Sequence, residues 1–212
     1  MASPERGREE NVAMTTRRAL PLAGPPVRVR RDAVANADRI LCAARCVVDA
    51  DGADALTMDR LAAEAGVGKG TVFRAFGSRA GVFAALTDDF ERNFQAAYLS
   101  GPPPLGPGAE PLDRLLAYGA GRIQLNGMHA ALLRAGARAP DGKFEVPARK
   151  VSAMHVRMLL RQCGVEADLE VLTEALLAPL DADLVHYLTS ERGLTQDDLV
   201  SGWKALVQSV AG

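Results

Sequence analysis

The chain has 212 residues, of which 48% are hydrophobic, 24% charged and 5% aromatic, and its formal net charge is −1. These proportions are ordinary for a soluble globular protein of one large or two small domains. The chain has no apolar run of about 18 residues and only three cysteines, which argues against a membrane protein and a disulfide scaffold. Its basic N-terminal residues are not followed by a continuous apolar segment, so we expect no secretory signal. We therefore expect a cytoplasmic protein.

Positive charge is concentrated near the N-terminus. Residues 1–31 contain seven arginines and three acids, whereas residues 100–212 contain eleven basic and thirteen acidic residues. Residues 1–31 mix proline, glycine, arginine and glutamate without periodicity, so we expect a mostly disordered basic extension. This extension is either a solvated tail or an arm that reaches DNA, in which case Arg28, Arg30 and Arg31 are the candidate contacts.

Every predicted element is a helix, as expected for a chain rich in Ala and Leu and poor in aromatic residues. Residues 101–111 contain five prolines and three glycines and cannot be helical. Thr195 and Asp198 have the spacing of a capping box, and Pro179 is expected to kink or restart its helix. In chain order, apolar periodicity predicts helices at about 32–49, 57–65, 68–76, 78–99, 112–125, 129–138, 147–163, 168–189 and 195–210.

Two of these helices, within residues 56–83, are short and joined by a tight turn. Thr57 is the expected N-cap of the first helix, and Gly66 can end that helix in a left-handed conformation. The second helix spans only two turns. Two short helices joined in this way form a helix-turn-helix, which places its second helix in the major groove of DNA.

The second short helix carries an outward set of basic, small and aromatic residues. Lysine and arginine can donate to guanine edges or phosphates, threonine can donate to a phosphate, and glycine lets the backbone approach closely. We therefore predict DNA contacts by Lys69, Gly70, Thr71, Phe73 and Arg74.

The same segment resembles the DNA-binding domain of the TetR family of bacterial one-component repressors. The resemblance covers about residues 33–83 and rests on a threonine, an LAxxAGV run, a GxxxxF pattern and a phenylalanine before a serine–basic pair. Phe73 stands where the family often has a tyrosine whose hydroxyl lies near a phosphate, and Ala80 stands where it usually has an acid. The residues that fit are Thr57, Leu61, Ala62, Ala65, Gly66, Val67, Thr71, Phe73, Phe76 and Arg79.

The resemblance implies an all-α regulator that binds a pseudo-palindromic double-stranded DNA operator as a homodimer. Thr57 and Arg79 would bind phosphates, the last two helices would form the dimer interface, and a small-molecule effector would release the DNA. The implied domains are a basic extension (1–31), a helix-turn-helix DNA-binding domain (32–78) and a helical ligand-binding and dimerisation domain (79–212).

An effector site is expected between the helix that starts near Ser78 and the helices after Pro111. A pocket for a small hydrophobic molecule has mainly apolar walls with a few polar groups, although the same residues serve equally well as plain core. Arg122 and Asn126 could add polarity. The candidates are Phe90, Phe94, Tyr98, Ile123, Met128, His129, Leu132, Met154, His155, Met158 and Leu176.

Other chemistries have little support. Residues 66–71 lack the glycine and the hydroxyl residue that a phosphate loop requires, and the three histidines lack metal-ligand spacing. Cys42 and Cys46, one turn apart, fit small core residues better than redox sensors. We expect no enzyme activity, cofactor or metal. The alternatives are a helical interaction module whose basic N-terminal part binds a protein or a membrane surface, and a small-molecule enzyme without a recognisable catalytic constellation.

Overall fold

The computed structural model describes residues 27–134 and 147–211. All regular elements in these residues are helical, which confirms the predicted all-α class. The α-helices are α1 (Val27–Asp51), α2 (Met58–Glu64), α3 (Lys69–Phe76), α4 (Arg79–Ser100), α5 (Pro111–Arg134), α6 (Pro147–Gln162), α7 (Leu169–Leu177), α8 (Ala182–Ser190) and α9 (Gln196–Ala211), with short 3-10 helices η1 (Ala53–Ala55) and η2 (Ala178–Leu180).

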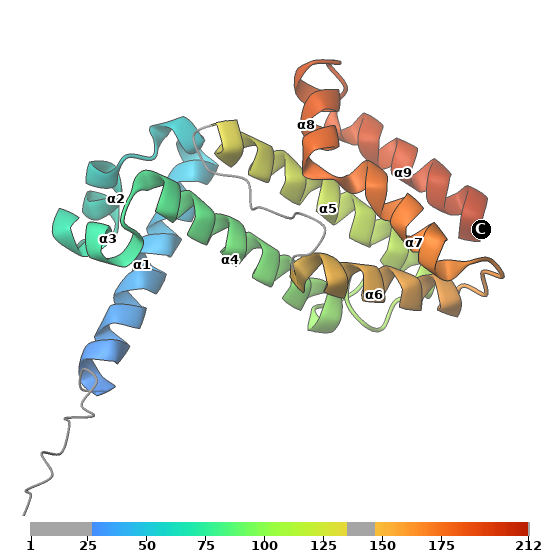
Figure 1. Cartoon of the computed structure of the whole chain (residues 1–212), viewed down its shortest axis with the longest axis horizontal. Helices are drawn as coiled ribbons and strands as arrows, with labels where there is room; N and C mark the ends of the chain where they lie inside the picture. Colours follow the sequence, from blue (N-terminus) through green and yellow to red (C-terminus); the bar gives the residue numbers. More distant parts are fainter. Residues whose placement is uncertain (1–26, 135–146, 212) are drawn as a thin grey trace, which may run out of the picture.

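The molecule has a head at one end, formed by α1 to α3, and a body formed by α5 to α9 (Figure 1). α4 starts in the head and runs along the body. α5 lies in the middle of the body and contacts α8 and α9 as well as α4 and α6. This arrangement makes α4 and α5 the two long helices that connect the head with the rest of the molecule.

The head has its own hydrophobic core. Ile40 and Val47 of α1, Leu61 of α2, Val72 of α3 and Leu86 of α4 are almost fully buried within it. α2 and α3 have only seven and eight residues, too few to be stable alone, so this shared core holds them in place.

One residue of the head core comes from the body. Leu132, near the end of α5, is fully buried in the same cluster as Ile40 and Leu86. α5 runs back along α4, so its last turns reach the head (Figure 1). The packing of the head therefore depends on the position of α5.

In the body, α5 packs closely against α9 and α4 through glycines. A methyl group on Gly119 would lie 2.0 Å from the Trp203 ring, and one on Gly121 would lie 2.7 Å from the Phe94 ring. Both rings therefore rest directly on the backbone of α5. A side chain at either glycine would push the neighbouring helix away.

Two predicted boundaries were wrong. α1 starts at Val27, five residues before the predicted start at Asp32, and residues 1–26 of the predicted extension lie outside the described part of the chain. A break was predicted between residues 125 and 129, yet α5 continues to Arg134. Asn126 there donates a hydrogen bond to the carbonyl of Leu180, and Gly127 faces Gln196, so tertiary contacts outweigh the weak local helix preference.

Other local predictions were correct. Thr57, Ser78 and the Thr195–Asp198 capping box all make the expected cap hydrogen bonds. The helix that contains Pro179 is interrupted by η2 and restarts as α8. Gly66 ends α2 with φ of +62°, the left-handed conformation that glycine adopts without strain.

Candidate DNA-binding surface and effector region

The helix-turn-helix is held by a few local interactions. The Thr57 side chain accepts a hydrogen bond from the Arg60 amide and begins α2, and residues 65–68 turn the chain into α3. Val72 of α3 is fully buried against the head core. Because Val72 points inward, the opposite face of α3 is presented to solvent.

That face contains the residues that were predicted to contact DNA. Lys69, Gly70, Phe73 and Arg74 are exposed, and Thr71 is partly exposed. Phe73 has 43% of its surface exposed, an unusual position for an aromatic ring without a partner. A methyl group on Gly70 would meet no atom within 4 Å, so the protein itself does not require glycine at this position.

Both basic groups on this face are held loosely by neighbours. The Lys69 ammonium lies 2.7 Å from an Asp59 carboxylate oxygen, and 54% of its side chain is exposed. The Arg74 guanidinium folds back along α3 and donates to the Gly70 carbonyl at 3.2 Å. Exposed pairs of this kind contribute at most about 1 kcal/mol, so exchanging them for a phosphate or a base costs little.

Arg79 faces the protein interior rather than the exposed face of α3. Its Nε donates to the Leu56 carbonyl at 2.7 Å, an Nη donates to the Ala53 carbonyl at 3.0 Å, and its guanidinium lies 4.6 Å from the centre of the Phe83 ring. These contacts attach η1 to the start of α4. Arg79 therefore helps to hold the turn before α2, and its predicted phosphate contact stays a prediction.

Arg28, Arg30 and Arg31 belong to the first turns of α1. Their side chains lie outside the described part of the structure, and so does that of His129. The structure therefore locates the backbone of these three arginines on α1.

The predicted effector residues do not form one site. Phe90 and Leu132 pack in the head core, and Ile123 and Leu176 belong to the body core. Met128, Met154 and Met158 are exposed, with 38%, 63% and 38% of their surfaces accessible, so they do not line an internal site. The three remaining candidates, Phe94, Tyr98 and His155, do come together.

Around these three residues lies a buried group that we call the α4–α6 polar cluster. It consists of Tyr98 from α4, Arg114, Tyr118 and Arg122 from α5, and Ser152 and His155 from α6. The ring centroids of Tyr98 and His155 are 4.5 Å apart, and those of Tyr98 and Tyr118 are 5.4 Å apart. Phe94 lies at the edge of the cluster, 5.4 Å from Tyr98 between ring centroids.

Arg122 joins all three helices. It donates to Glu91 of α4 at 2.6 Å and to the Ser152 hydroxyl of α6 at 3.3 Å, and it lies 4.7 Å from the centre of the Phe94 ring. Only 11% of its side chain is exposed, so loss of Glu91 would leave a largely buried charge without compensation.

Burial changes the acid–base properties of the cluster. Desolvation, followed by the charge of Arg114, lowers the pKa of His155 to about 4, so its imidazole is neutral near pH 7. Desolvation also raises the pKa of Tyr98 to about 12. Arg114, Tyr118 and His155 each have a buried nitrogen or oxygen atom without a hydrogen-bond partner among the described residues.

Sequence analysis missed Arg114, Tyr118 and Ser152. Arg114, Tyr118 and Arg122 follow one another at intervals of four residues, so a periodic polar stripe was visible, but such a stripe normally faces solvent. The proposal that Cys42 and Cys46 are small core residues was also wrong, because both are exposed on α1.

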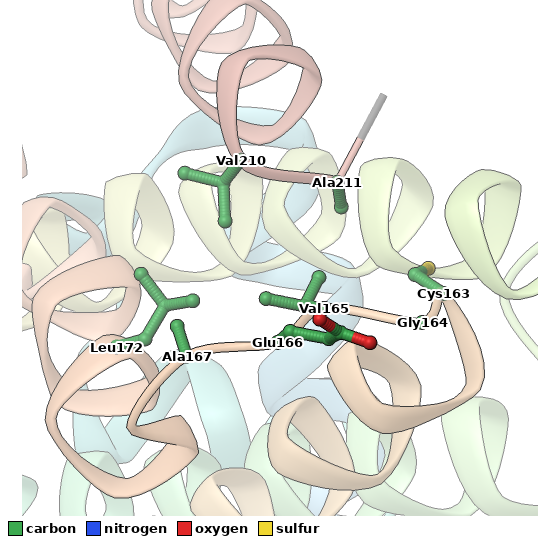
Figure 2. Close-up of a pocket in the computed structure, with 8 residues that line it drawn as sticks. All are labelled: Cys163, Gly164, Val165, Glu166, Ala167, Leu172, Val210 and Ala211. Atoms are coloured by element: carbon green, nitrogen blue, oxygen red, sulfur yellow. The ribbon is translucent and has the colours of Figure 1, made fainter.

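A surface hollow lies elsewhere, between the α6–α7 turn and the end of α9. Cys163, Val165, Glu166, Leu172 and Val210 are among its lining residues (Figure 2). It is wide open and contains none of the predicted effector residues. The hollow therefore does not correspond to the predicted effector site.

Comparisons with known proteins support the interpretation of the head. Residues 40–86 match the family model of bacterial regulatory proteins of the tetR family. No curated protein matches the sequence. None of the described helices is both long and apolar enough to cross a lipid bilayer.

Solved structures share the fold of most of the chain. A protein described as a TetR-family transcriptional regulator from Rhodococcus sp. has a TM-score of 0.54 at 19% identity, with 84% of this chain and 98% of that chain covered. A TetR-family transcriptional regulator from Mesorhizobium loti MAFF303099 has a TM-score of 0.53 at 15% identity, with 84% of this chain and 95% of that chain covered. A TetR-family transcriptional regulator from Haemophilus influenzae RD has a TM-score of 0.52 at 17% identity, with 86% of this chain and 100% of that chain covered.

The fold and the exposed second helix are those of a helix-turn-helix head. Residues 40–86 are similar to bacterial regulatory proteins of the tetR family, in agreement with the resemblance found in the sequence.

Proposed function

We propose that the protein is a homodimeric repressor that binds a palindromic operator and is released from it by a small-molecule effector. The observation that carries this proposal is that one face of α3 is open to solvent. The residues on this face are Lys69, Gly70, Thr71, Phe73 and Arg74. Thr57 at the start of α2 is exposed as well and can donate its hydroxyl hydrogen to a phosphate.

The N-terminal arginines extend this surface in the proposal. Arg28, Arg30 and Arg31 are at the start of α1, where basic residues can reach the DNA backbone or the adjacent minor groove. In the same proposal, residues 1–31 are a basic extension, 32–78 the DNA-binding domain and 79–212 the ligand-binding and dimerisation domain.

Dimerisation through α8 and α9 is supported by exposed apolar residues. Leu184 and Tyr187 of α8 and Leu206 of α9 have 38%, 41% and 38% of their surfaces accessible. A stable interface buries about 1,200–2,000 Å² in total, with an apolar centre, and these residues would supply that centre. Two heads held in this way would read two half-sites about one helical turn of DNA apart.

Effector control is supported by the α4–α6 polar cluster. It joins α4, which begins directly after α3, to two helices of the body. A ligand that binds one arrangement of these helices more tightly than the other would shift the population of DNA-binding heads.

Selection from a random duplex DNA pool tests the proposal, with the full-length protein at near-physiological salt. Enrichment of one inverted repeat is the expected result, and its affinity should fall steeply with salt while remaining sequence-dependent. Recovery of no consensus sequence, with weak and uniform retention, would favour an interaction module that is not a sequence reader.

A further inference from the structure

The α4–α6 polar cluster contains more positive charge than its own residues neutralise. Arg122 is paired with Glu91. Arg114 has only 8% of its surface exposed, and its one hydrogen bond in the described part of the chain is a long one of 3.4 Å from Nη2 to the carbonyl of Tyr98. With His155 neutral, the cluster has a net charge of about +1 at neutral pH.

Unsatisfied polar atoms surround this charge. Nε of Arg114, Nε2 of His155 and the hydroxyl of Tyr118 are buried without a hydrogen-bond partner among the described residues. The Tyr118 hydroxyl lies close enough to Arg122 to raise the pKa of the guanidinium. Native proteins rarely leave several such atoms unpaired in one place unless a ligand or water completes them.

The remaining walls of the cluster are flat aromatic rings. The centroids of Phe94, Tyr98, Tyr118 and His155 are 4.5–5.7 Å apart in the pairs that touch. Rings at these distances offer edges and faces to another ring. Charge, donors and ring faces are therefore within one small region.

We propose that this cluster is the effector site and that its effector is a small aromatic monocarboxylate. The carboxylate pairs with Arg114, and it accepts hydrogen bonds from the Tyr118 hydroxyl and from His155 in the tautomer with hydrogen on Nε2. The aromatic ring lies against Tyr98 and Phe94. A cation is repelled by Arg114, and a dianion leaves an uncompensated charge.

Binding at this place also affects α4. Tyr98 belongs to α4 and His155 to α6, and their rings are in contact, so an inserted ring has to separate the two helices. This inference rests on the proposed function, because effector control of DNA binding gives the site its purpose.

Calorimetric titration of the full-length protein with sodium benzoate and with benzamide tests the charge requirement. The two probes have the same ring, and only benzoate carries a charge. Benzoate is expected to bind at least about tenfold more tightly, the scale of a charge-assisted hydrogen bond. Arg114→Met is expected to remove this preference, whereas Arg157→Met on the exposed side of α6 leaves it unchanged.

The Tyr118→Phe variant distinguishes an effect on benzoate affinity from an effect on the stability of the fold. Loss of an unpaired buried hydroxyl leaves the melting temperature of the free protein equal or higher, while benzoate affinity falls about tenfold. In wild-type protein, benzoate also raises the pKa of His155, measured from its imidazole NMR signals, because the carboxylate neutralises Arg114.

Equal affinities for the two probes, or no benzoate binding, would overturn the inference and leave an ordered water as the partner of the buried atoms. The same protein preparation is assayed for sequence-specific DNA binding. Specific DNA binding without a benzoate response contradicts this inference alone, whereas loss of sequence specificity contradicts the proposed function.

Discussion

The indole ring of Trp203 on α9 rests on the backbone of Gly119 on α5, where a methyl group would lie 2.0 Å from the ring. The indole Nε1 also donates to the Leu115 carbonyl at 3.2 Å, and Trp203 is only 3% exposed. This contact fixes the distance between the central helix of the body and the last helix.

Gly119→Ala is therefore expected to destabilise the protein by about 1–3 kcal/mol, because the added methyl forces Trp203 or α9 to move. Gly202→Ala is the matched control, since a methyl there meets no atom within 4 Å and alanine favours a helix by about 1 kcal/mol. Urea unfolding measures both changes. Equal stability of the two variants would show that α9 adjusts freely.

Arg79→Met is expected to destabilise the protein by about 2 kcal/mol, because the carbonyls of Leu56 and Ala53 lose a charged donor. Arg92→Met, on the same helix, is expected to have little effect because 69% of the Arg92 side chain is exposed. Thermal unfolding compares the two. If Arg79→Met melted like wild type yet bound DNA poorly, Arg79 would be a phosphate contact after all.

Arg74→Ala is expected to weaken specific DNA binding by at least about 1 kcal/mol, the contribution of one good base contact. Its stability should change little, since its contacts are limited to its own helix. Fluorescence anisotropy with the selected operator and a scrambled duplex measures the effect. Unchanged affinity and selectivity would remove Arg74 from the DNA-binding surface.

Stability is expected to depend on pH through His155. Its folded pKa of about 4 lies below the ordinary value of 6.5, so between these pH values the unfolded chain binds a proton that the folded chain does not. The free energy of unfolding should therefore fall as the pH decreases from 6.5 to 4, by up to about 3 kcal/mol, and this contribution should level off below pH 4. His155→Phe should flatten this part of a pH series, and an unchanged slope would assign it to other groups.

Tyr187→Glu on α8 is expected to convert the dimer to a monomer and to abolish operator binding, because it places a charge in the proposed apolar centre of the interface. Val171→Glu is the control, since Val171 is 66% exposed and belongs to α7 rather than to α8 or α9. Sedimentation measures the mass of both variants. A dimeric Tyr187→Glu protein would place the interface elsewhere.

The local signals in the sequence were enough for most of the fold. Thr57, Ser78 and the Thr195–Asp198 pair cap helices through neighbours three residues away, and such signals can be read from a sequence. Asn126 and Gly127 were misread as a break, because what keeps them helical is contact with Leu180 and Gln196 far along the chain.

The candidate sites also differ in how far the sequence predicts them. The outward residues of α3 follow from helical spacing once Val72 is placed inside. The effector residues could not be grouped, since Phe94, Phe90 and Leu132 have similar apolar patterns but belong to different cores. Arg114 was missed because burial of a charged side chain depends on which helices surround it, and spacing alone does not give this.

Leu132 has a consequence for how the protein is made. It fills part of the head core, although the rest of that core comes from residues 40–86. A ribosome that has released only the DNA-binding segment has therefore delivered an incomplete core, with a cavity where Leu132 belongs. Full packing of the head has to wait until most of α5 has emerged, so the nascent chain completes its helix-turn-helix late in synthesis.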